Sequence, residues 1–378
     1  MLLLAEMQTA SLFGSDWTLV DLGTLGGSQT FADSINDLGQ VVGISQLPND
    51  DDSHAFFYAN GVMQDIAPIN SGDIRGGRLG LNNFGNIASG VVVGGAYYPA
   101  IYQGGQTTTL GSLGCMSDFT GVATAINDSG LAVGYSYLSA GGVRHAFAYR
   151  DGSMRDLGSL GGYSGALAVN SSGVAVGFAS DTMNGFGRAV VWANNSILDI
   201  SHGFESEARG INDLGQIVGE TMGPTGTRQG FLWSNGASEN LGTLTTGRNS
   251  EAYSINNSGD VVGTADVISS ISFETNPITR QITTITNYHN HAFLFSNGSI
   301  VDLNSLISTN SGWELNYAFG VNNSDQIVGW GSMDGGEHFR SFILEVPEPN
   351  SCAIVASATA AILIFRRWRR KRMRNVYG

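Results

Sequence analysis

Ile35-Asn36-Asp37-Leu38-Gly39 is the first of seven copies of one pattern in this chain of 378 residues. The pattern is an aliphatic residue, Asn, a small polar residue, any residue and Gly. Later copies lie at 81–85, 126–130, 169–173, 211–215, 255–259 and 321–325, the last with Asp325 in place of Gly. Successive asparagines are 46, 45, 43, 42, 44 and 66 residues apart. The chain is therefore a repeat array, with about 22 extra residues inserted after Gly263 in one unit.

Each unit divides into four segments of strand length. The first ends at the Asn and alternates with period two, with a small residue two positions before the Asn in every copy. The second follows the Gly, as in Gln40-Val41-Val42-Gly43, and the third is His54-Ala55-Phe56 or its equivalent. A turn such as Asn60-Gly61 leads to a fourth, as in Met154-Arg155-Asp156-Leu157-Gly158. Asn-Asp-x-Gly and Asn-Gly are hairpin signals, because Gly adopts positive φ without steric cost.

Composition agrees with many short strands. The 53 glycines and the 13% share of charged residues disfavour a helical protein, while 42% hydrophobic residues suffice for a core. Two cysteines, Cys115 and Cys352, exclude a disulfide scaffold. Four strands per unit at this period match the blade of a β-propeller; β-solenoid coils are shorter, and serial β-sandwiches would need linkers. We predict an all-β, seven-bladed β-propeller of four-stranded blades over residues 17–345, with the small-residue strand innermost.

The two ends of this region are expected to close the ring. The last unit runs through Phe339 to Leu344 without a fourth strand, whereas the segment beginning at Trp17 is a fourth strand with no unit before it. Together they make one complete blade, which removes exposed strand edges. We therefore predict that the strand containing Leu19 pairs with the strand containing Ile343.

Basic residues are concentrated in the C-terminal tail. Seven of the 18 basic residues lie between Arg366 and Arg374, against 32 acidic residues in the chain. The rest of the chain is so acidic that it would repel a phosphate backbone, which excludes nucleic acid as a partner. An uncharged stretch from Asn350 to Phe365 precedes the basic cluster and predicts a hydrophobic helix that tethers the protein to a membrane, with the basic residues cytoplasmic. The membrane-flanking residues are Arg366, Arg367, Arg369, Arg370, Lys371 and Arg372.

This tail resembles the PEP-CTERM sorting signal. Val346-Pro347-Glu348-Pro349, the uncharged stretch and the arginine cluster reproduce its three parts in order, over residues 346–374. The resemblance implies a substrate of a membrane exosortase in a Gram-negative bacterium that makes extracellular polysaccharide. It implies an inner-membrane-tethered precursor that later reaches the cell surface or the extracellular space.

The repeats resemble the HAF family of extracellular proteins. His-Ala-Phe and Asp-Leu-Gly-Thr-Leu-Gly-Gly, the latter at Asp21 to Gly27, carry the likeness over Trp17 to Glu345. The family implies a cellular setting without a defined activity. Residues 1–16 lack a basic n-region, and Glu6 interrupts their apolar run, so we interpret them as a truncated signal or leader whose true start lies upstream.

Catalytic motifs are absent from the sequence. It contains no Gly-x-Ser-x-Gly, phosphate loop or His-Glu-x-x-His. His54, His145 and His291 occupy the same place in three units and are interpreted as structural, each bonding within its blade. His289 and His291 form a His-x-His pair for which no third metal ligand lies nearby in sequence. We therefore predict a protein that is not an enzyme and has no cofactor.

Three features are candidates for ligand binding. Aromatic residues that would stack on sugars, with packing between blades as the alternative, are Tyr97, Tyr98, Tyr135, Tyr137 and Trp330. Asp50, Asp51 and Asp52 are weak candidates for calcium, with a solvated loop as the alternative. The insert at 264–290 is either a functional loop or a plain hairpin extension.

The predicted function is an exported cell-surface or extracellular-matrix protein with a binding or structural role, whose partners are an exopolysaccharide or surface proteins. The alternatives are a glycan-active lyase or hydrolase and a calcium-dependent adhesin. An enzyme would gather three or more titratable side chains at the mouth of the central channel; a neutral, shallow mouth would favour binding.

Overall fold

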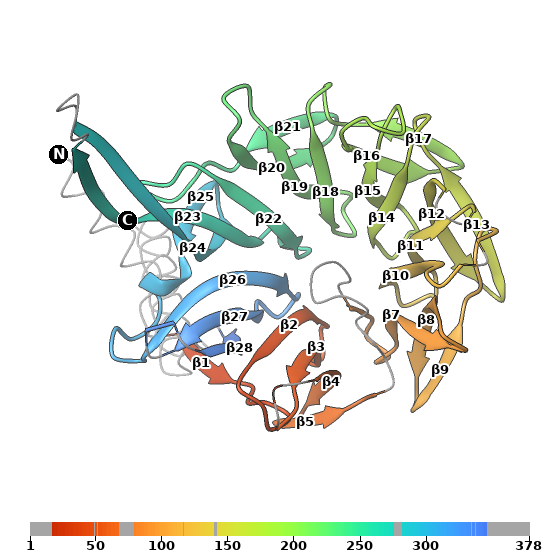
Figure 1. Ribbon diagram of the computed structural model, residues 1–378, viewed down its shortest axis with the longest axis horizontal. Coiled ribbons are helices and arrows are strands. Elements are labelled where there is room, and N and C mark those ends of the chain that lie inside the picture. The colour runs from red at the N-terminus through yellow and green to blue at the C-terminus, as the bar shows by residue number, and fades with distance from the viewer. Residues whose placement is uncertain are drawn as a thin grey trace, which may run out of the picture. The chain divides into compact units, whose positions relative to one another are not determined.

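Seven four-stranded antiparallel sheets surround a common centre in the computed structural model (Figure 1). The structure describes residues 17–345, except 49, 51, 68–78, 116, 140–141, 276–281, 334 and 337. Each sheet is one blade of a β-propeller. The predicted all-β fold with seven four-stranded blades is therefore confirmed.

The strands follow one another outward within each blade, first strand innermost. Blade one contains β2 (Thr30–Ile35), β3 (Val41–Gln46), β4 (Ser53–Ala59) and β5 (Val62–Asp65). Blade two contains β6 (Gly80–Leu81), β7 (Ile87–Val93), β8 (Ala96–Gln103) and β9 (Gln106–Thr109). Blade three contains β10 (Gly121–Ile126), β11 (Ala132–Tyr137), β12 (Arg144–Arg150) and β13 (Ser153–Gly158). Blade four contains β14 (Ser164–Val169), β15 (Ala175–Ala179), β16 (Arg188–Ala193) and β17 (Ser196–Asp199).

The remaining blades hold the insert and the closure. Blade five contains β18 (Ser206–Ile211), β19 (Ile217–Met222), β20 (Arg228–Ser234) and β21 (Ala237–Asn240). Blade six contains β22 (Ser250–Ile255), β23 (Val261–Thr275), β24 (Ile282–Ser296) and β25 (Ser299–Asp302), followed by the short 3-10 helix η1 (Leu303–Ser305). Blade seven contains β26 (Trp313–Val321), β27 (Ile327–Met333), β28 (His338–Glu345) and β1 (Thr18–Asp21).

Ring closure follows the prediction. The sheet order of blade seven is β1-β28-β27-β26, so the first strand of the chain is the outermost strand of the last blade. The backbone N–H of Leu22 donates to Ser341 O (3.0 Å), and Arg340 pairs with Asp21 (3.0 Å). Leu22 is buried in a cluster with Ile343 and with Phe56 of blade one. The beginning and the end of the propeller thus share one blade and one core.

Small residues line the innermost strands because neighbouring blades converge there (Figure 1). A Cβ added to Gly80 would lie 2.6 Å from Ala125 Cα in the next blade, and one added to Gly320 would lie 3.0 Å from Ile35 Cγ2. Positions two before the Asn therefore admit only small side chains. The structure confirms the predicted innermost strand.

A Phe of the third strand anchors blades one, three, six and seven. Phe56, Phe147 and Phe293 are fully buried, as is Phe342 at the same place in blade seven. A glycine of the second strand lies directly against each ring, and a Cβ added to Gly43 would approach Phe56 Cε1 to 2.9 Å. The repeated Val-Gly of the second strand and the repeated Phe of the third are thus one packing unit.

The innermost strands contain β-bulges that the sequence pattern does not predict. The pairing of β2, β10, β14, β18, β22 and β26 with the second strand shifts by one residue at the same point. In β18 the unpaired residue is Arg209, and in β10 it is Thr124, whose hydroxyl donates to Ala166 O of the next blade (2.7 Å). A bulge turns one side chain away from the regular alternation, and here it directs Arg209 into a charged cluster.

Turns on the two faces of the ring differ. The turns between third and fourth strands contain two residues that both have positive φ, such as Asn60 (52°) with Gly61 (79°) and Asn297 (52°) with Gly298 (76°). This geometry is that of type I′ hairpins. We call the side with these turns and the Asn turns the belt face, and the side with the loops between second and third strands the loop face.

The insert is a hairpin extension. β23 and β24 are each 15 residues long and pair without interruption from Val261–Phe295 to Thr275–Ile282 apart from one bulge. They extend outward from the ring (Figure 1). Residues 264–290 thus form a hairpin extension in structure, and a functional role for them stays a prediction.

Several predictions fall outside the described residues. They concern the leader at 1–16, the sorting motif from Val346 to Pro349, the hydrophobic helix at 350–365 and the basic cluster from Arg366 to Arg372. Within the part of the chain that the structure describes, no helix is long and apolar enough to cross a membrane.

Replacing Leu22 with alanine tests the closure of the ring. Leu22 occupies the place after the fourth strand that Leu110 occupies in blade two, and both are buried and donate their N–H to the third strand. We expect Leu22→Ala and the matched Leu110→Ala each to lower the free energy of unfolding by about 2–4 kcal/mol in urea titrations. A much smaller loss for Leu22→Ala than for Leu110→Ala would mean that the first strand is not an integral part of blade seven.

Candidate functional site

Seven asparagine side chains join the blades in a closed circle, which we call the asparagine belt. Each Nδ2 donates to the backbone carbonyl of the Asn in the next blade, at 2.8–3.2 Å. The circle closes where Asn322 Nδ2 donates to Asn36 O (2.9 Å). The members, all buried, are Asn36, Asn82, Asn127, Asn170, Asn212, Asn256 and Asn322.

The same side chains shape the turns. The Oδ1 of every belt asparagine accepts the backbone N–H four positions later, as Asn36 does from Gln40 (3.0 Å). The repeated Asn was predicted only as a hairpin signal. The sequence did not predict that the same Asn links neighbouring blades, because this contact exists only once the blades are arranged in the ring.

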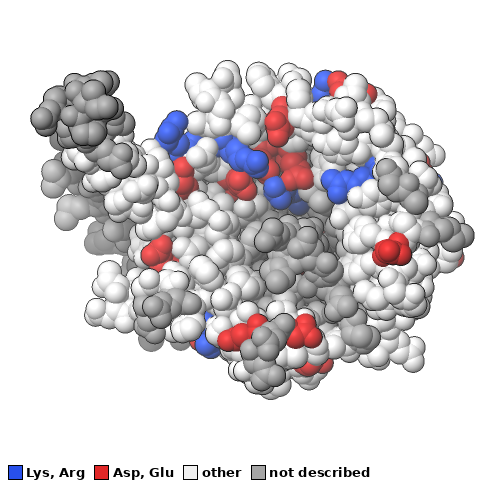
Figure 2. Space-filling model, in the orientation of Figure 1, with Lys and Arg blue, Asp and Glu red and all other residues white. Residues whose placement is uncertain are grey.

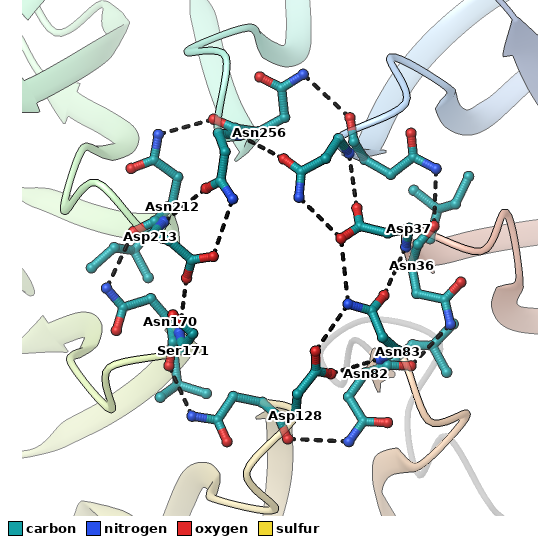
Figure 3. Close-up of a pocket in the computed structure, with 18 of the residues that line it drawn as sticks. Asn36, Asp37, Asn82, Asn83, Asp128, Asn170, Ser171, Asn212, Asp213 and Asn256 are labelled. Atoms are coloured by element: carbon teal, nitrogen blue, oxygen red, sulfur yellow. Dashed lines mark hydrogen bonds between the residues drawn. The ribbon is translucent and has the colours of Figure 1, made fainter.

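A second circle of polar residues lies beside the belt and lines the mouth of the central channel (Figure 3). Backbone N–H groups donate to the Oδ1 of the next residue in the circle, and six such bonds are 2.8–2.9 Å long. The members are Asp37, Asn83, Asp128, Ser171, Asp213, Asn257 and Asn323. The pocket that the two circles enclose has a volume of about 200 Å³.

Three of these residues are carboxylates, which is the arrangement expected of the enzyme alternative. Asp37, Asp128 and Asp213 are separated around the circle by amides and a hydroxyl. Each accepts hydrogen bonds from its neighbours, as Asp37 does from the Nδ2 of Asn323 (3.0 Å) and of Asn83 (3.3 Å). The mouth is therefore not neutral, but its carboxylates are already engaged in linking blades.

The carboxylate of Asp213 illustrates this engagement. Burial raises its pKa, but hydrogen bonds from the backbone and side chain of Ser171 and from the Asn257 amide outweigh burial and hold the pKa below its usual value. The ionised form is thus the one that the folded ring favours.

The three repeated histidines bond within their blades, as predicted. Each Nδ1 bonds the carboxylate eleven residues later: His54 to Asp65 (2.7 Å), His145 to Asp156 (2.9 Å) and His291 to Asp302 (2.6 Å). The same carboxylates accept the backbone N–H two residues on. Where His is missing, Arg188 and Arg340 pair with Asp199 and Asp21. The Asp of Asp-Leu-Gly is therefore part of the scaffold.

A charged cluster lies on the loop face at blades five and six. Arg209 donates through Nε and Nη2 to both oxygens of the buried Glu220 (2.5 and 2.7 Å) and also contacts Glu207 (2.6 Å). Arg228 reaches Glu220 (3.4 Å) and Glu251 (3.6 Å). Figure 2 shows side chains of both signs gathered over β18 to β22, beside the centre of the ring.

Burial and ion pairing act against each other in the electrostatics of this cluster. Burial raises the pKa of Glu220, an effect to which the neighbouring carboxylates of Glu207 and Glu251 add and which Arg209 opposes. Burial also lowers the pKa of Arg209, but Glu220 and Glu207 more than compensate and raise it. Arg209 is held in this position by the bulge of β18.

The cluster forms one side of a cleft that spans blades three to five. Arg144 lies on its opposite side, over the rings of Tyr135, Tyr163 and Phe178 at 4.6–5.7 Å from the ring centroids. The volume of the cleft is about 330 Å³. Its further lining includes Glu205, Met222 and Arg228. None of these residues belongs to the repeated pattern, so sequence periodicity could not identify them.

The predicted aromatic candidates all lie on second or third strands. Tyr97 is buried and stacks on Phe119 (centroids 5.0 Å apart), and Tyr137 meets the edge of the same ring. Phe119 precedes the first strand of blade three and Tyr97 belongs to blade two, so this stack packs two blades together.

The other aromatic candidates are spread around the ring. Trp330 of blade seven meets Phe31 of blade one edge to face (5.4 Å), and Tyr135 lies beneath Arg144. Tyr98 is half-buried. These contacts show the rings used in packing, and a role for them in ligand binding stays a prediction.

The acidic loop of blade one uses its carboxylates locally. Asp50 Oδ1 accepts the N–H of Ser28 (2.7 Å), and Asp52 Oδ1 accepts the N–H of Ser53 (2.8 Å). Asp51 lies outside the described residues. Calcium at this loop stays a prediction.

Glu314 corrects the expectation for the His289–His291 pair. We expected no third ligand because none is close in sequence, but Glu314 of blade seven lies 3.5 Å from His289 Nδ1 and 3.8 Å from His291 Nε2. Within the described ranges, this is the one group of three His, Cys, Asp or Glu side chains whose ligand atoms all lie within 4.8 Å of one another. These three side chains therefore form a candidate metal site.

Comparison with solved structures agrees with the fold. The chain is similar to a puromycin-hydrolysing peptidase from Mycobacterium tuberculosis (10% identity, TM-score 0.51), over 89% of this chain and 57% of the peptidase. It is also similar to the β-propeller domain of the trilobed protease from Pyrococcus furiosus (9% identity, TM-score 0.45), over 85% and 99% of the two chains, and to TolB from Acinetobacter baumannii (14%, TM-score 0.40), over 90% and 82%.

These similarities concern the fold alone, given identities of 9–14%. The chain spans little more than half the length of the puromycin-hydrolysing peptidase. No protein-family model and no curated protein matches the sequence.

Replacing one belt asparagine with aspartate tests the belt. Asn212→Asp keeps the shape and the Oδ1 acceptor but removes the donor to Asn256 O (2.9 Å) and sets a carboxylate against that carbonyl. We expect a loss of about 1–3 kcal/mol in the free energy of unfolding. Asn235→Asp, in an exposed turn, serves as the control and should change it by less than about 0.5 kcal/mol. Equal effects of the two variants would contradict the linking role.

The depressed pKa of Asp213 predicts a pH dependence. Because the folded-state pKa of Asp213 lies below the usual value of an aspartate, the stabilisation by its carboxylate is present above that usual value and is lost as the pH falls through the folded pKa. Asp213 is exposed and its interactions are screened by solvent, so Asp213→Asn should be less stable than the parent at pH 7 by only about 0.5 kcal/mol, and the gap should close at pH values below the folded pKa. Urea titrations across this range measure it. A gap independent of pH would show that the charge of Asp213 contributes nothing.

Proposed function

We propose that this chain is an exported cell-surface or extracellular-matrix β-propeller that binds polysaccharide through the cleft on its loop face, without covalent chemistry. The observation that carries the proposal is the cleft itself. Its charged side chains are held in place by one another, as Arg209 is by Glu207 and Glu220, while Arg144, Arg228 and Glu205 line its rim. Pre-positioned polar groups around a concave surface are typical of ligand sites.

The chemistry of the cleft suits a polyhydroxylated ligand. Guanidinium groups donate several hydrogen bonds in a plane, and carboxylates accept them, so neighbouring hydroxyls can bond both kinds of group. Tyr163 and Phe178 add apolar ring surface beside Arg144. Charges of both signs are present, which favours a neutral or weakly charged sugar chain over a polyanion.

The export part of the proposal rests on the sequence of the tail. The Val346–Pro349 box, the uncharged stretch and the arginine cluster resemble a PEP-CTERM signal. We accordingly propose processing by an exosortase, after tethering of the precursor in the inner membrane. A scaffold whose repeated polar groups are satisfied internally is suited to display one blade-specific surface at the cell exterior.

A glycan-active enzyme is the second candidate, because three carboxylates gather at the channel mouth. Hydrolysis or elimination on a sugar needs an acid and a base at a defined separation. Asp37, Asp128 and Asp213 supply the groups, although each is engaged in hydrogen bonds between blades. The enzyme proposal therefore places its site on the belt face and the binding proposal places its site on the loop face.

A glycan array probed with the full chain, with and without calcium, tests the binding proposal. We expect retention of a bacterial polysaccharide and at least a tenfold weaker affinity for Arg144→Ala in calorimetric titration, because a charged hydrogen-bond donor is removed from the cleft. Arg150→Ala is the matched control, since Arg150 ends the same strand on the belt face. Its affinity should equal that of the parent.

The same incubations separate the two candidates. New reducing ends or unsaturated products that disappear in Asp128→Asn would establish the enzyme and overturn the binding proposal. Binding without product formation that is lost in Arg144→Ala and kept in Arg150→Ala would support the binding proposal. No retention of any polysaccharide, or equal affinity of the Arg144 and Arg150 variants, would contradict it.

A further inference from the structure

We propose that His289, His291 and Glu314 bind a transition-metal dication of the Zn²⁺ class at the junction of blades six and seven. The proposal is independent of polysaccharide binding. It rests on two imidazoles and one carboxylate whose ligand atoms lie within 4.8 Å of one another.

The two histidines face the same side of one strand. They occupy alternate positions of β24, where side chains two residues apart lie on one face. Their rings are stacked, with centroids 4.8 Å apart and planes inclined by 26°. The long pairing of β24 with β23 fixes the strand at both residues, since His291 pairs with Ala265 and His289 with Val267.

Glu314 completes the set from a different blade. It lies near the start of β26, the innermost strand of blade seven, and its Oε1 is 3.5 Å from His289 Nδ1 and 3.8 Å from His291 Nε2. Ligand bonds of about 2.1 Å in a tetrahedron place neighbouring ligand atoms about 3.4 Å apart. All three ligand atoms lie within 4.8 Å of one another, so side-chain shifts of about an ångström bring them to the separation that a metal requires.

A second set of contacts orients the ligands. Asp302 Oδ2 accepts a hydrogen bond from His291 Nδ1 (2.6 Å), which leaves the lone pair of Nε2 directed to the Glu314 side. Carboxylate–histidine–metal arrangements of this kind are the usual support of metal-bound imidazoles. Asn316 Nδ2 donates to Glu314 Oε1 (3.1 Å) and to Asn290 O (3.0 Å), so one amide holds the carboxylate and joins β26 to β24.

Among the three described blades that carry a His–Asp pair, only blade six adds a second histidine to it. His54 and His145 each bond an Asp equivalent to the partner of His291. The residues two positions before them are Asp52 and Val143, so neither has a second histidine beside it. The repeated His–Asp pair alone thus serves the scaffold. The addition of His289 and Glu314 turns one copy of it into a ligand set.

The ligand chemistry selects the metal. Two imidazole nitrogens and one carboxylate suit Zn²⁺ and related ions, whereas Ca²⁺ and Mg²⁺ require six or more oxygen ligands. The side chains of His289 and Glu314 are 40% and 41% exposed, so solvent can supply a fourth ligand. The ion would connect the extended hairpin to the innermost strand of the next blade.

The test uses the untagged full chain after treatment with a chelator. We expect calorimetric titration with ZnCl₂ to give one site per chain. Zn²⁺ should raise the Tm and CaCl₂ should not. The Co²⁺-loaded protein should show the visible absorption of a four-coordinate centre. His289→Gln and Glu314→Gln should each weaken Zn²⁺ binding more than tenfold. Asp302→Asn should weaken it about 10–100-fold.

His145→Gln is the matched control, because it removes the equivalent His–Asp pair of blade three and leaves the three proposed ligands unchanged. Its affinity for Zn²⁺ should equal that of the parent. Tm values without metal establish that each variant is folded. The proposal is overturned if no site binds Zn²⁺, if His289→Gln and Glu314→Gln bind it as tightly as the parent, or if His145→Gln weakens binding to the same extent as they do.

Discussion

One hydrogen bond, repeated seven times, sets the geometry of this protein: the side-chain amide of an asparagine donates to the backbone carbonyl of the equivalent asparagine one blade further on. A side chain this short reaches the next blade only if the blades meet at the centre at a constant small separation. The small residues two positions earlier make that approach possible. The closed ring, in which the first strand of the chain completes the last blade, meets this requirement.

The repeated residues hold the scaffold together, and the blade-specific residues form the candidate sites. Repeated polar groups satisfy one another: belt asparagines bond carbonyls, and the His or Arg of the third strand bonds the Asp of the fourth. The side chains left to recognise other molecules are those that depart from the pattern, notably Arg144, Glu205 and Arg228 around the cleft and Glu314 beside the two histidines. Periodicity thus identifies the scaffold, and departures from it identify the candidate sites.

The sequence allowed the prediction of the blades, the innermost strand and the closure of the ring by the first strand, because turn chemistry and period-two alternation act over short distances. It did not allow the prediction of the bulge at Arg209, since a bulge exists only relative to a paired strand. Glu314 was missed because it is 23 residues beyond His291 and belongs to another blade. The aromatic candidates were identified by residue type, which does not distinguish Tyr97 packed between blades from a ring free to stack on a ligand.

The connections on the two faces of the ring differ in how much their lengths vary. On the belt face, successive strands are joined by tight turns of nearly uniform length, several of them of two residues with positive φ. On the loop face, the corresponding connections range from short loops to the extended hairpin of blade six. Peptide segments grafted onto the loop face should therefore leave the circle of amides undisturbed. Related rings can acquire new recognition properties by divergence of these loops alone, while the opposite side is retained as an invariant frame.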